Sequence, residues 1–224
     1  MAADVANVTV KEETIDDAVA AVQQLRTTPG VDPERVFVVG HSLGGYVAPR
    51  VGAAAPGKVA GIGLLEANSS PLGRLIVDQF EYLASEEGGS DPGAAAQLEA
   101  IRAQVAVAES PTLSSSTPAA DLPLGVPAAY WLDLRSYDPL GTAAALQIPI
   151  FIAQGGRDYQ VPPSELTAWR DALADREDVT IREYPTLNHL LLEGSGPSRP
   201  AEYAVAGHVA EEVVADLVAW IRRS

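Results

Sequence analysis

The stretch 36–45, Val-Phe-Val-Val-Gly-His-Ser-Leu-Gly-Gly, constrains the fold of this chain more than any other. Four apolar residues predict a buried strand, and the residues from Tyr46 onward predict a helix. Between them, Ser42 stands in a Gly-x-Ser-x-Gly pattern, which holds a serine on a sharp turn with its hydroxyl exposed. We expect glycine at Gly40 and Gly44 because a side chain there would collide with the neighbouring strand or helix. The pattern therefore predicts that Ser42 is a nucleophile.

A phosphate-binding turn is the alternative interpretation of this stretch. A phosphate loop requires Gly-Lys-Ser or Gly-Lys-Thr, and a dinucleotide site requires Gly-x-Gly-x-x-Gly. The sequence contains neither at this place. The nucleophile interpretation is the one we carry forward.

The composition narrows the classes of partner and cofactor. The chain has 224 residues and a formal net charge of −15, which argues against nucleic acid or an anionic membrane as partners. It has no cysteine, which excludes disulfides and thiolate metal sites, and its three histidines are too far apart to suggest a metal centre. We therefore expect neither a metal nor a cofactor.

The N-terminal residues contain no basic region followed by an apolar run, and no stretch reaches membrane-spanning length. From the chain as it stands, we expect a cytoplasmic protein. A longer, secreted parent protein is the alternative.

Helices and strands alternate over much of the chain. An amphipathic helix is predicted over about 11–28, and buried strands over 36–39, 59–65, 149–153 and 179–184. Two further helices are predicted over about 164–174 and 209–223. This alternation predicts an α/β fold with a mainly parallel sheet of about four strands and flanking helices.

The alternation stops between about residues 69 and 147. Two helices are predicted near 72–83 and 94–108, followed by a loop over 110–127 rich in Pro, Ser and Thr and by an aromatic cluster at 128–134. We interpret 69–147 as a helical cap inserted over the carboxyl edge of the sheet, and 1–68 with 148–224 as the catalytic core.

Ser42, Asp158 and His189 each follow a predicted strand. The carboxyl ends of parallel strands meet at one edge of a sheet, so these distant residues are expected to be neighbours. In such an arrangement His189 takes the proton of Ser42, and Asp158 orients the imidazole and stabilises its charged form. Glu66 is the rival acid, at the end of the strand 59–65, and His208 the rival base. His41 lies within the turn itself and is expected to point away from Ser42.

Three segments carry a family resemblance: 40–45 (Gly-His-Ser-Leu-Gly-Gly), 154–161 (Gln-Gly-Gly-Arg-Asp-Tyr-Gln-Val) and 184–191 (Tyr-Pro-Thr-Leu-Asn-His-Leu-Leu). They resemble serine hydrolases of the α/β-hydrolase superfamily, in particular bacterial esterases and dienelactone-hydrolase-like proteins near the acylaminoacyl peptidases. The segment 130–139 is also similar to that subgroup. The resemblance extends from about residue 10 to 221.

The resemblance implies a longer sheet than this chain provides. In the family, eight strands form the sheet and the nucleophile follows the fifth, whereas Ser42 follows the first convincing strand. We therefore expect a truncated α/β-hydrolase fold. The backbone N–H of Leu43 remains as an oxyanion donor, while the loop that gives the second donor is missing. The strand before Ser42 would be an apolar sheet edge, which invites pairing and predicts a homodimer or larger homo-oligomer.

The function that follows is a serine carboxylic-ester hydrolase acting on small or medium acyl esters. The apolar cap residues Phe80, Tyr130, Trp131 and Leu132 are the expected substrate pocket. An amidase, a thioesterase or a lactonase would use the same residues. A non-catalytic protein is the other alternative: a truncated module derived from a hydrolase, with little or no catalysis.

Overall fold

The computed structural model describes residues 7–86 and 92–224, which fall into two compact units. One unit comprises Asp17–Ser69 and Asp138–Ser224 and contains the sheet. The other comprises Ser70–Tyr137 and the described residues up to Asp16. Within the described residues there are eight α-helices and four strands, and no helix is long and apolar enough to cross a membrane.

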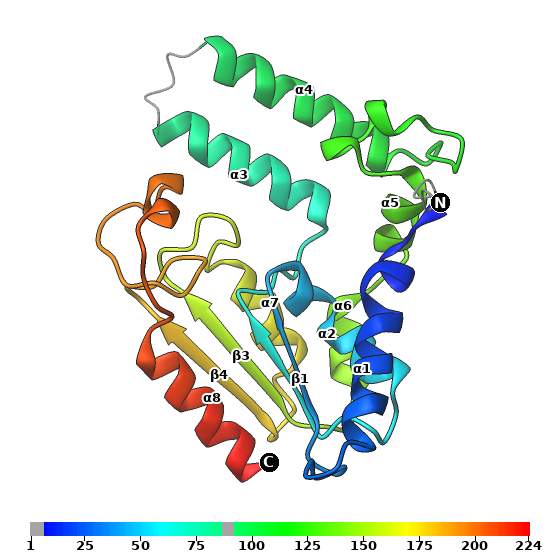
Figure 1. Cartoon of the computed structure of the whole chain (residues 1–224). Helices are drawn as coiled ribbons and strands as arrows, with labels where there is room; N and C mark the ends of the chain where they lie inside the picture. The colour runs from blue at the N-terminus through cyan, green and yellow to red at the C-terminus, as the bar shows by residue number, and fades with distance from the viewer. Residues whose placement is uncertain (1–6, 87–91) are drawn as a thin grey trace. The chain divides into compact units, whose positions relative to one another are not determined.

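The sheet unit is built on four parallel strands in the order β1-β2-β3-β4. Their bounds are β1 Phe37–His41, β2 Gly61–Leu65, β3 Ile150–Gly155 and β4 Val179–Tyr184. The connecting helices are α1 Asp16–Arg26, α2 Leu43–Ala54, α6 Pro139–Ala145, α7 Glu165–Ala172 and α8 Glu211–Arg223. The predicted α/β fold with a parallel sheet of four strands is confirmed (Figure 1).

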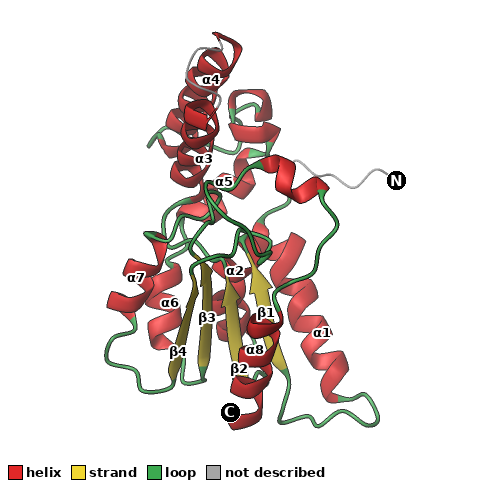
Figure 2. Cartoon of the chain, turned by 90° about the vertical axis from the view of Figure 1, so that its left-hand side faces the viewer, coloured by secondary structure: helices red, strands yellow, loops and turns green. Residues whose placement is uncertain are grey.

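Side chains alternate between the two faces of the sheet, as the period of a strand requires. Ile150 and Ile152 of β3 face a core formed with α1, α2, α6 and α7, in which Trp169 is fully buried. Phe151 and Ala153 face a second core, closed by α8 through Trp220. Figure 2 shows α8 in front of the sheet and α2 behind it. Both faces are therefore covered, as is usual for a parallel sheet.

The burial of the edge strand β1 differs from its prediction. The four apolar residues 36–39 suggest burial on both faces, but of these only Val36, just before the strand, is buried, and Val39 is 41% exposed. Strand β1 pairs with β2 on one side, and within the described residues no strand pairs with its other side. Among the described residues β1 is therefore an edge strand, as expected, but it is less buried than its apolar run suggests.

The second unit is helical. Its helices are α3 Leu72–Glu86, α4 Pro92–Glu109 and α5 Ala128–Arg135, and a π-helical turn, Lys11–Ile15, leads along the chain into α1. Arg102 of α4 forms an ion pair with Glu81 of α3. The predicted helices are present, and α6, which lies within the stretch 69–147 interpreted as the insertion, groups with the sheet unit. A cap role for the helical unit stays a prediction.

Candidate active site

The turn between β1 and α2 holds Ser42 in a strained conformation. Its backbone has φ 57° and ψ −124°, a region that L-residues rarely occupy outside functional turns. The N–H of Ser42 donates to the carbonyl of Leu65, 2.9 Å away, which fixes the turn to the end of β2. Leu43 is the first residue of α2, so its N–H has no acceptor within the helix and is available to an anion.

The glycines of this turn only partly follow the prediction. A Cβ on Gly40 would lie 2.0 Å from the carbonyl oxygen of Gly44, so glycine is required there. At Gly44 the prediction is wrong, because a Cβ there would have no atom within 4 Å. The close approach is at Gly45 instead, where a Cβ would lie 2.8 Å from the Cβ of Ala67. The helix therefore packs on the segment after β2 through Gly45.

Asp158 lies in the loop after β3 and is 3% exposed. Its Oδ1 accepts hydrogen bonds from the backbone N–H groups of Gln160 and Val161, at 2.8 and 2.9 Å. Its Oδ2 lies 2.7 Å from Nδ1 of His189. Three donors directed at one buried carboxyl group fix its orientation.

His189 lies in the loop after β4 and is 5% exposed. The preceding residue, Asn188, organises this loop: its Oδ1 accepts from the N–H groups of Leu190 and Leu192, and its Nδ2 donates to Glu202 at 2.9 Å. With Nδ1–H donated to Asp158, the imidazole has its Nε2 free to accept a proton. Asn188 was not among the predicted site residues, because its role depends on the folded loop.

His41 has a role that the sequence did not reveal. Its Nε2 lies 2.6 Å from the carbonyl oxygen of His189, to which it donates, and the two rings are 4.7 Å apart between centroids. Partial burial is the main factor that lowers the pKa of His41, so the neutral form is favoured. His41 thus anchors the backbone of His189. Its place in the turn was the available signal, but its partner is 148 residues away in the sequence.

Glu66, the rival acid, lies at the same edge of the sheet and is fully buried. Its Oε1 accepts from the N–H of Gly155 and its Oε2 from Nε2 of Gln154, each at 2.7 Å. Burial, followed by the charge of Asp158, raises the pKa of Glu66 to about 11. The carboxyl group that faces His189 is that of Asp158.

The structure therefore brings Asp158 and His189 together and places Ser42 in the same sheet unit. The hydroxyl of Ser42 has no hydrogen-bond partner within residues 7–86 and 92–224. In hydrolases of this kind the catalytic hydrogen bonds often form only when substrate is bound.

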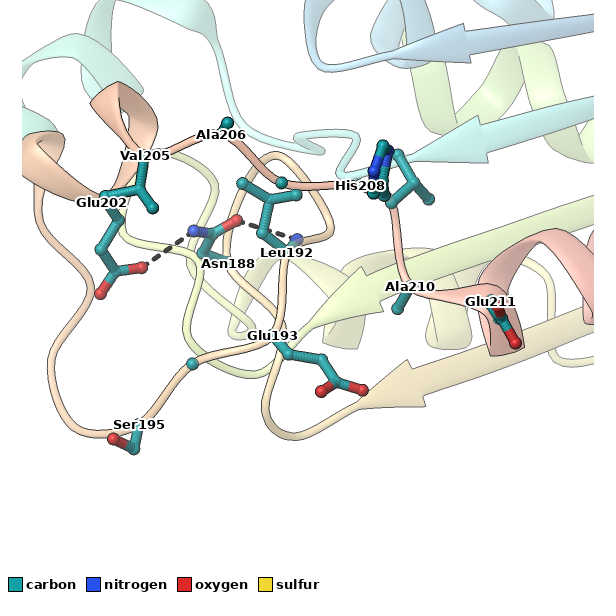
Figure 3. Close-up of a pocket in the computed structure, with 13 residues that line it drawn as sticks. Asn188, Leu192, Glu193, Ser195, Glu202, Val205, Ala206, His208, Ala210 and Glu211 are labelled. Atoms are coloured by element: carbon teal, nitrogen blue, oxygen red, sulfur yellow. Dashed lines mark hydrogen bonds between the residues drawn. The ribbon is translucent and has the colours of Figure 1, made fainter.

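The rival base His208 is exposed and lines a separate pocket of about 640 Å³ (Figure 3).

That pocket lies between the His189 loop and the segment 202–211. Asn188 and Glu202, joined by the hydrogen bond drawn in Figure 3, are at one side of it, and its lining contains none of Ser42, Asp158 and His189. A second, apolar pocket of about 420 Å³ is formed by α8 with His41, Leu65 and Leu190.

The four predicted pocket residues belong to the helical unit. Trp131 is 5% exposed, and its indole N–H is buried without a hydrogen-bond partner among the described residues. The hydroxyl of Tyr130 donates to Glu13 at 2.6 Å, and Leu132 and Phe80 are half-buried. Their role as a substrate pocket stays a prediction.

Comparison with known proteins agrees with the fold. Esterase EstD of Thermotoga maritima is 35% identical over 219 residues, which are 97% of this chain and 50% of that protein. The chain thus spans about half the length of this curated relative.

Two solved structures share the fold at low identity. Dipeptidyl peptidase 4 of Porphyromonas gingivalis has a TM-score of 0.54 and 15% identity, covering 93% of this chain and 22% of that one. An esterase of Pyrococcus furiosus has a TM-score of 0.51 and 15% identity, and the match covers 96% of this chain and 64% of the esterase chain. The profile described as "Alpha/beta hydrolase family" matches residues 3–206. This chain belongs to the alpha/beta hydrolase family.

Proposed function

We propose that this chain is a serine carboxylic-ester hydrolase in which Ser42, His189 and Asp158 form the catalytic triad. The observation that carries the proposal is the 2.7 Å contact between Nδ1 of His189 and the buried Oδ2 of Asp158. The strained conformation of Ser42 at the start of α2 supports it, because this geometry exposes a nucleophile at a helix N-terminus. The similarity to an esterase favours ester substrates.

The reaction has two halves. Ser42 Oγ attacks the ester carbonyl carbon while its proton passes to Nε2 of His189, and the N–H of Leu43 donates to the oxyanion. The alkoxide leaves as an alcohol with the proton from His189, and Ser42 remains acylated. Water then attacks the acyl-enzyme, again giving a proton to His189, and the acid is released as Ser42 regains its proton. Asp158 stabilises the imidazolium in both halves.

Phe80, Tyr130, Trp131 and Leu132 are the proposed acyl pocket, which would favour small or medium acyl chains. Their apolar and aromatic character is typical of a site that binds uncharged substrate. A second oxyanion donor is usual in such enzymes, and losing one donor costs about a hundred- to a thousandfold in rate. The alternative is a hydrolase-derived module with little or no catalysis.

The test is labelling with a fluorophosphonate probe, together with hydrolysis of p-nitrophenyl acetate and butyrate. We expect the wild-type protein to be labelled and to show a burst, and Ser42→Ala to lose both. Ser114→Ala, at an exposed serine, is the matched control and is expected to behave as wild type. Labelling that persists in Ser42→Ala would contradict the assignment. A wild-type protein with neither labelling nor a burst would support the non-catalytic module.

An amidase, a thioesterase and a lactonase would all use the same three residues. Relative kcat/KM values for a matched ester, anilide, thioester and lactone separate them. A kcat/KM that is highest for the ester is the result expected.

We also propose that the chain forms a homodimer or larger homo-oligomer. The supporting observations are the outer edge of β1, where Val39 is 41% exposed, and the exposed apolar residues Val214 and Val218 of α8. Open strand edges and apolar patches are common association surfaces.

A further inference from the structure

We propose that Glu202 is a positioning residue for the triad: its carboxylate holds the loop of Asp158 and the loop of His189 in one arrangement. This deepens the proposed function and rests on it, in that Asp158 and His189 are taken as members of the triad. Glu202 lies in a third segment, the short 3₁₀ helix Pro200–Ala204. From there it contacts the residue that directly precedes each of these two triad members.

Each oxygen of the Glu202 carboxylate binds one of the two loops. Oε1 accepts a hydrogen bond from Nη2 of Arg157, and the two side chains form an ion pair. Oε2 accepts from Nδ2 of Asn188 at 2.9 Å, the bond drawn in Figure 3, and from Oγ of Ser198 at 3.3 Å. Arg157 belongs to the loop after β3 and Asn188 to the loop after β4, so a single side chain connects the two loops.

Arg157 brings a buried charge to this contact. Its side chain is 8% exposed, and within the part of the chain that the structure describes Glu202 is the carboxylate with which it forms an ion pair. Its Nε donates to the carbonyl of Gly196 at 2.8 Å, and its backbone N–H donates to the carbonyl of Leu187 at 2.9 Å. A buried cation that loses its counter-charge is strongly destabilised. Removing the carboxylate of Glu202 is therefore expected to displace the guanidinium and, with it, the start of the Asp158 loop.

Asn188 fixes the loop of His189 through its side chain. It is 0% exposed, and its Oδ1 accepts from the N–H groups of Leu190 and Leu192, which closes the loop around His189. Glu202 holds the same amide group by its other end, because it accepts from Nδ2. A buried donor that loses its acceptor is costly to leave unpaired. Without Glu202 the side chain of Asn188 is expected to turn away and release the two N–H groups.

Tyr203 attaches the same short helix to the residues that follow Asp158. Its hydroxyl accepts from Nε2 of Gln160 at 3.0 Å, and its ring stacks on that of Tyr159, with centroids 6.3 Å apart and an angle of 12° between the planes. The backbone N–H of Gln160 is one of the donors to Oδ1 of Asp158. The segment 200–204 thus contacts the Asp158 loop both before and after the aspartate. The tyrosine contacts do not involve the carboxylate, so the helix is expected to stay docked when only the carboxylate is removed.

The contacts of Glu202 keep it ionised. Burial acts to raise the pKa of Glu202, but the hydrogen bonds from Asn188 and Arg157 and the charge of Arg157 outweigh burial and hold this pKa below its ordinary value. The carboxylate is therefore an acceptor for both loops at neutral pH.

The two loops that Glu202 connects are the loops that the triad joins. The 2.7 Å contact between Nδ1 of His189 and Oδ2 of Asp158 sets the position of the imidazole, which must lie within hydrogen-bond reach of Ser42 to take its proton. A misplacement of about 1 Å at reacting groups costs about a hundredfold in rate. A smaller drift of the loops is expected to lower kcat and leave KM nearly unchanged, because Glu202 acts on the triad and not on the bound substrate.

The test compares two substitutions of Glu202 with a control. Glu202→Ala removes the acceptor of both loops, so we expect kcat for p-nitrophenyl butyrate, per site titrated with the fluorophosphonate probe, to fall about tenfold or more, with KM within about twofold. Glu202→Gln keeps an acceptor for Asn188 but loses the charge opposite Arg157, so a loss of about three- to tenfold is expected. The control is Glu211→Gln, which removes the charge of an exposed glutamate that lines the same pocket and should leave kcat unchanged.

A second measurement reports on the triad without activity. The Nδ1–H that His189 donates to Asp158 is expected to give a far-downfield proton NMR signal in wild type, in Ser42→Ala and in Glu211→Gln. We expect this signal to be shifted or broadened in Glu202→Ala, because the two loops are no longer held together. A Glu202→Ala protein that melts at a lower temperature but keeps the wild-type kcat and signal would overturn the proposal, since Glu202 would then only stabilise the fold. If Glu202→Ala does not fold, a wild-type kcat and signal in Glu202→Gln overturn it.

The two proposals fail separately. If Ser42→Ala retains full esterase activity while Glu202→Ala alters the signal, the proposed function fails and Glu202 still positions the pair of Asp158 and His189. If Ser42→Ala loses activity while Glu202→Ala keeps the wild-type kcat and signal, the positioning role of Glu202 fails and the triad stands.

Discussion

The Nδ1 of His189 lies 2.7 Å from Oδ2 of Asp158, although the two residues are 31 positions apart and belong to loops after different strands. The carbonyl oxygen of the same histidine accepts from His41 at the end of β1. The imidazole is therefore held by its ring and by its backbone at once. This double attachment is the basis of the first prediction.

Replacing Asp158 by Asn should abolish most activity. The amide can present a donor to Nδ1, which favours the wrong tautomer of His189, and the loss in kcat is expected to be about 10⁴-fold. Steady-state hydrolysis of p-nitrophenyl butyrate measures it. Asp175→Asn, at an exposed aspartate, is the control and should leave kcat unchanged. A kcat near wild type in Asp158→Asn would remove Asp158 from the triad.

The glycines of the turn should respond differently to alanine. Gly40→Ala places a Cβ 2.0 Å from a backbone oxygen and is expected to lower the free energy of unfolding by about 1–3 kcal/mol or more. Gly44→Ala has open space and lies within α2, where alanine is favoured over glycine by about 1 kcal/mol. Thermal unfolding of the two variants gives the comparison. Equal losses in Tm would contradict the geometry of the turn.

Trp131→Ala tests the proposed acyl pocket. If the ring contacts the acyl chain, the ratio of kcat/KM for acetyl and longer esters should shift, because the removed ring leaves space for a longer chain. Trp131→Phe keeps most of the ring volume and should retain the wild-type ratio. A variant that loses stability by about 3–5 kcal/mol but keeps the chain-length profile would show a structural role only.

The edge of β1 should govern assembly. Light scattering at micromolar concentration is expected to show a dimer or larger species. Val39→Lys, which places a charge on the open edge, should shift it toward monomer. The control is Val205→Lys, at a valine that is 68% exposed and outside the sheet, which should leave the mass unchanged. A monodisperse wild-type monomer would contradict the proposed assembly.

Glu66 should make stability depend on pH. Its pKa is raised from 4.5 to about 11 in the folded protein, so between these values the folded state binds more protons than the unfolded state. The stability that this group contributes is therefore fully present below about pH 4.5 and is lost as the pH rises toward 11. Glu66→Gln removes this dependence. We expect the free energy of unfolding of Glu66→Gln, measured by urea denaturation, to rise relative to that of wild type as the pH is raised from 5 to 9.

The sequence by itself determined the order of the helices and strands. It also determined which residues lie at the carboxyl ends of the parallel strands. The apolar runs and the Gly-x-Ser-x-Gly pattern are local features, so they placed the four strands and the turn of Ser42 within a few residues. Asp158 and His189 were found because each follows a strand, and parallel strands end at a common edge. That rule predicts which residues lie near one another, but it does not predict which of their atoms are in contact.

Tertiary structure decided the contacts within that neighbourhood. Asp158 and Glu66 both follow strands, and only the folded loops give Asp158 the bond to His189 and leave Glu66 buried with neutral donors. The close glycine is Gly45 and not Gly44 because the packing of α2 on Ala67 is set by the sheet. Hydrogen bonds and van der Waals contacts change over tenths of an ångström. Periodicity and spacing in a sequence specify faces and ends of elements, which is far coarser than the distances on which these contacts depend.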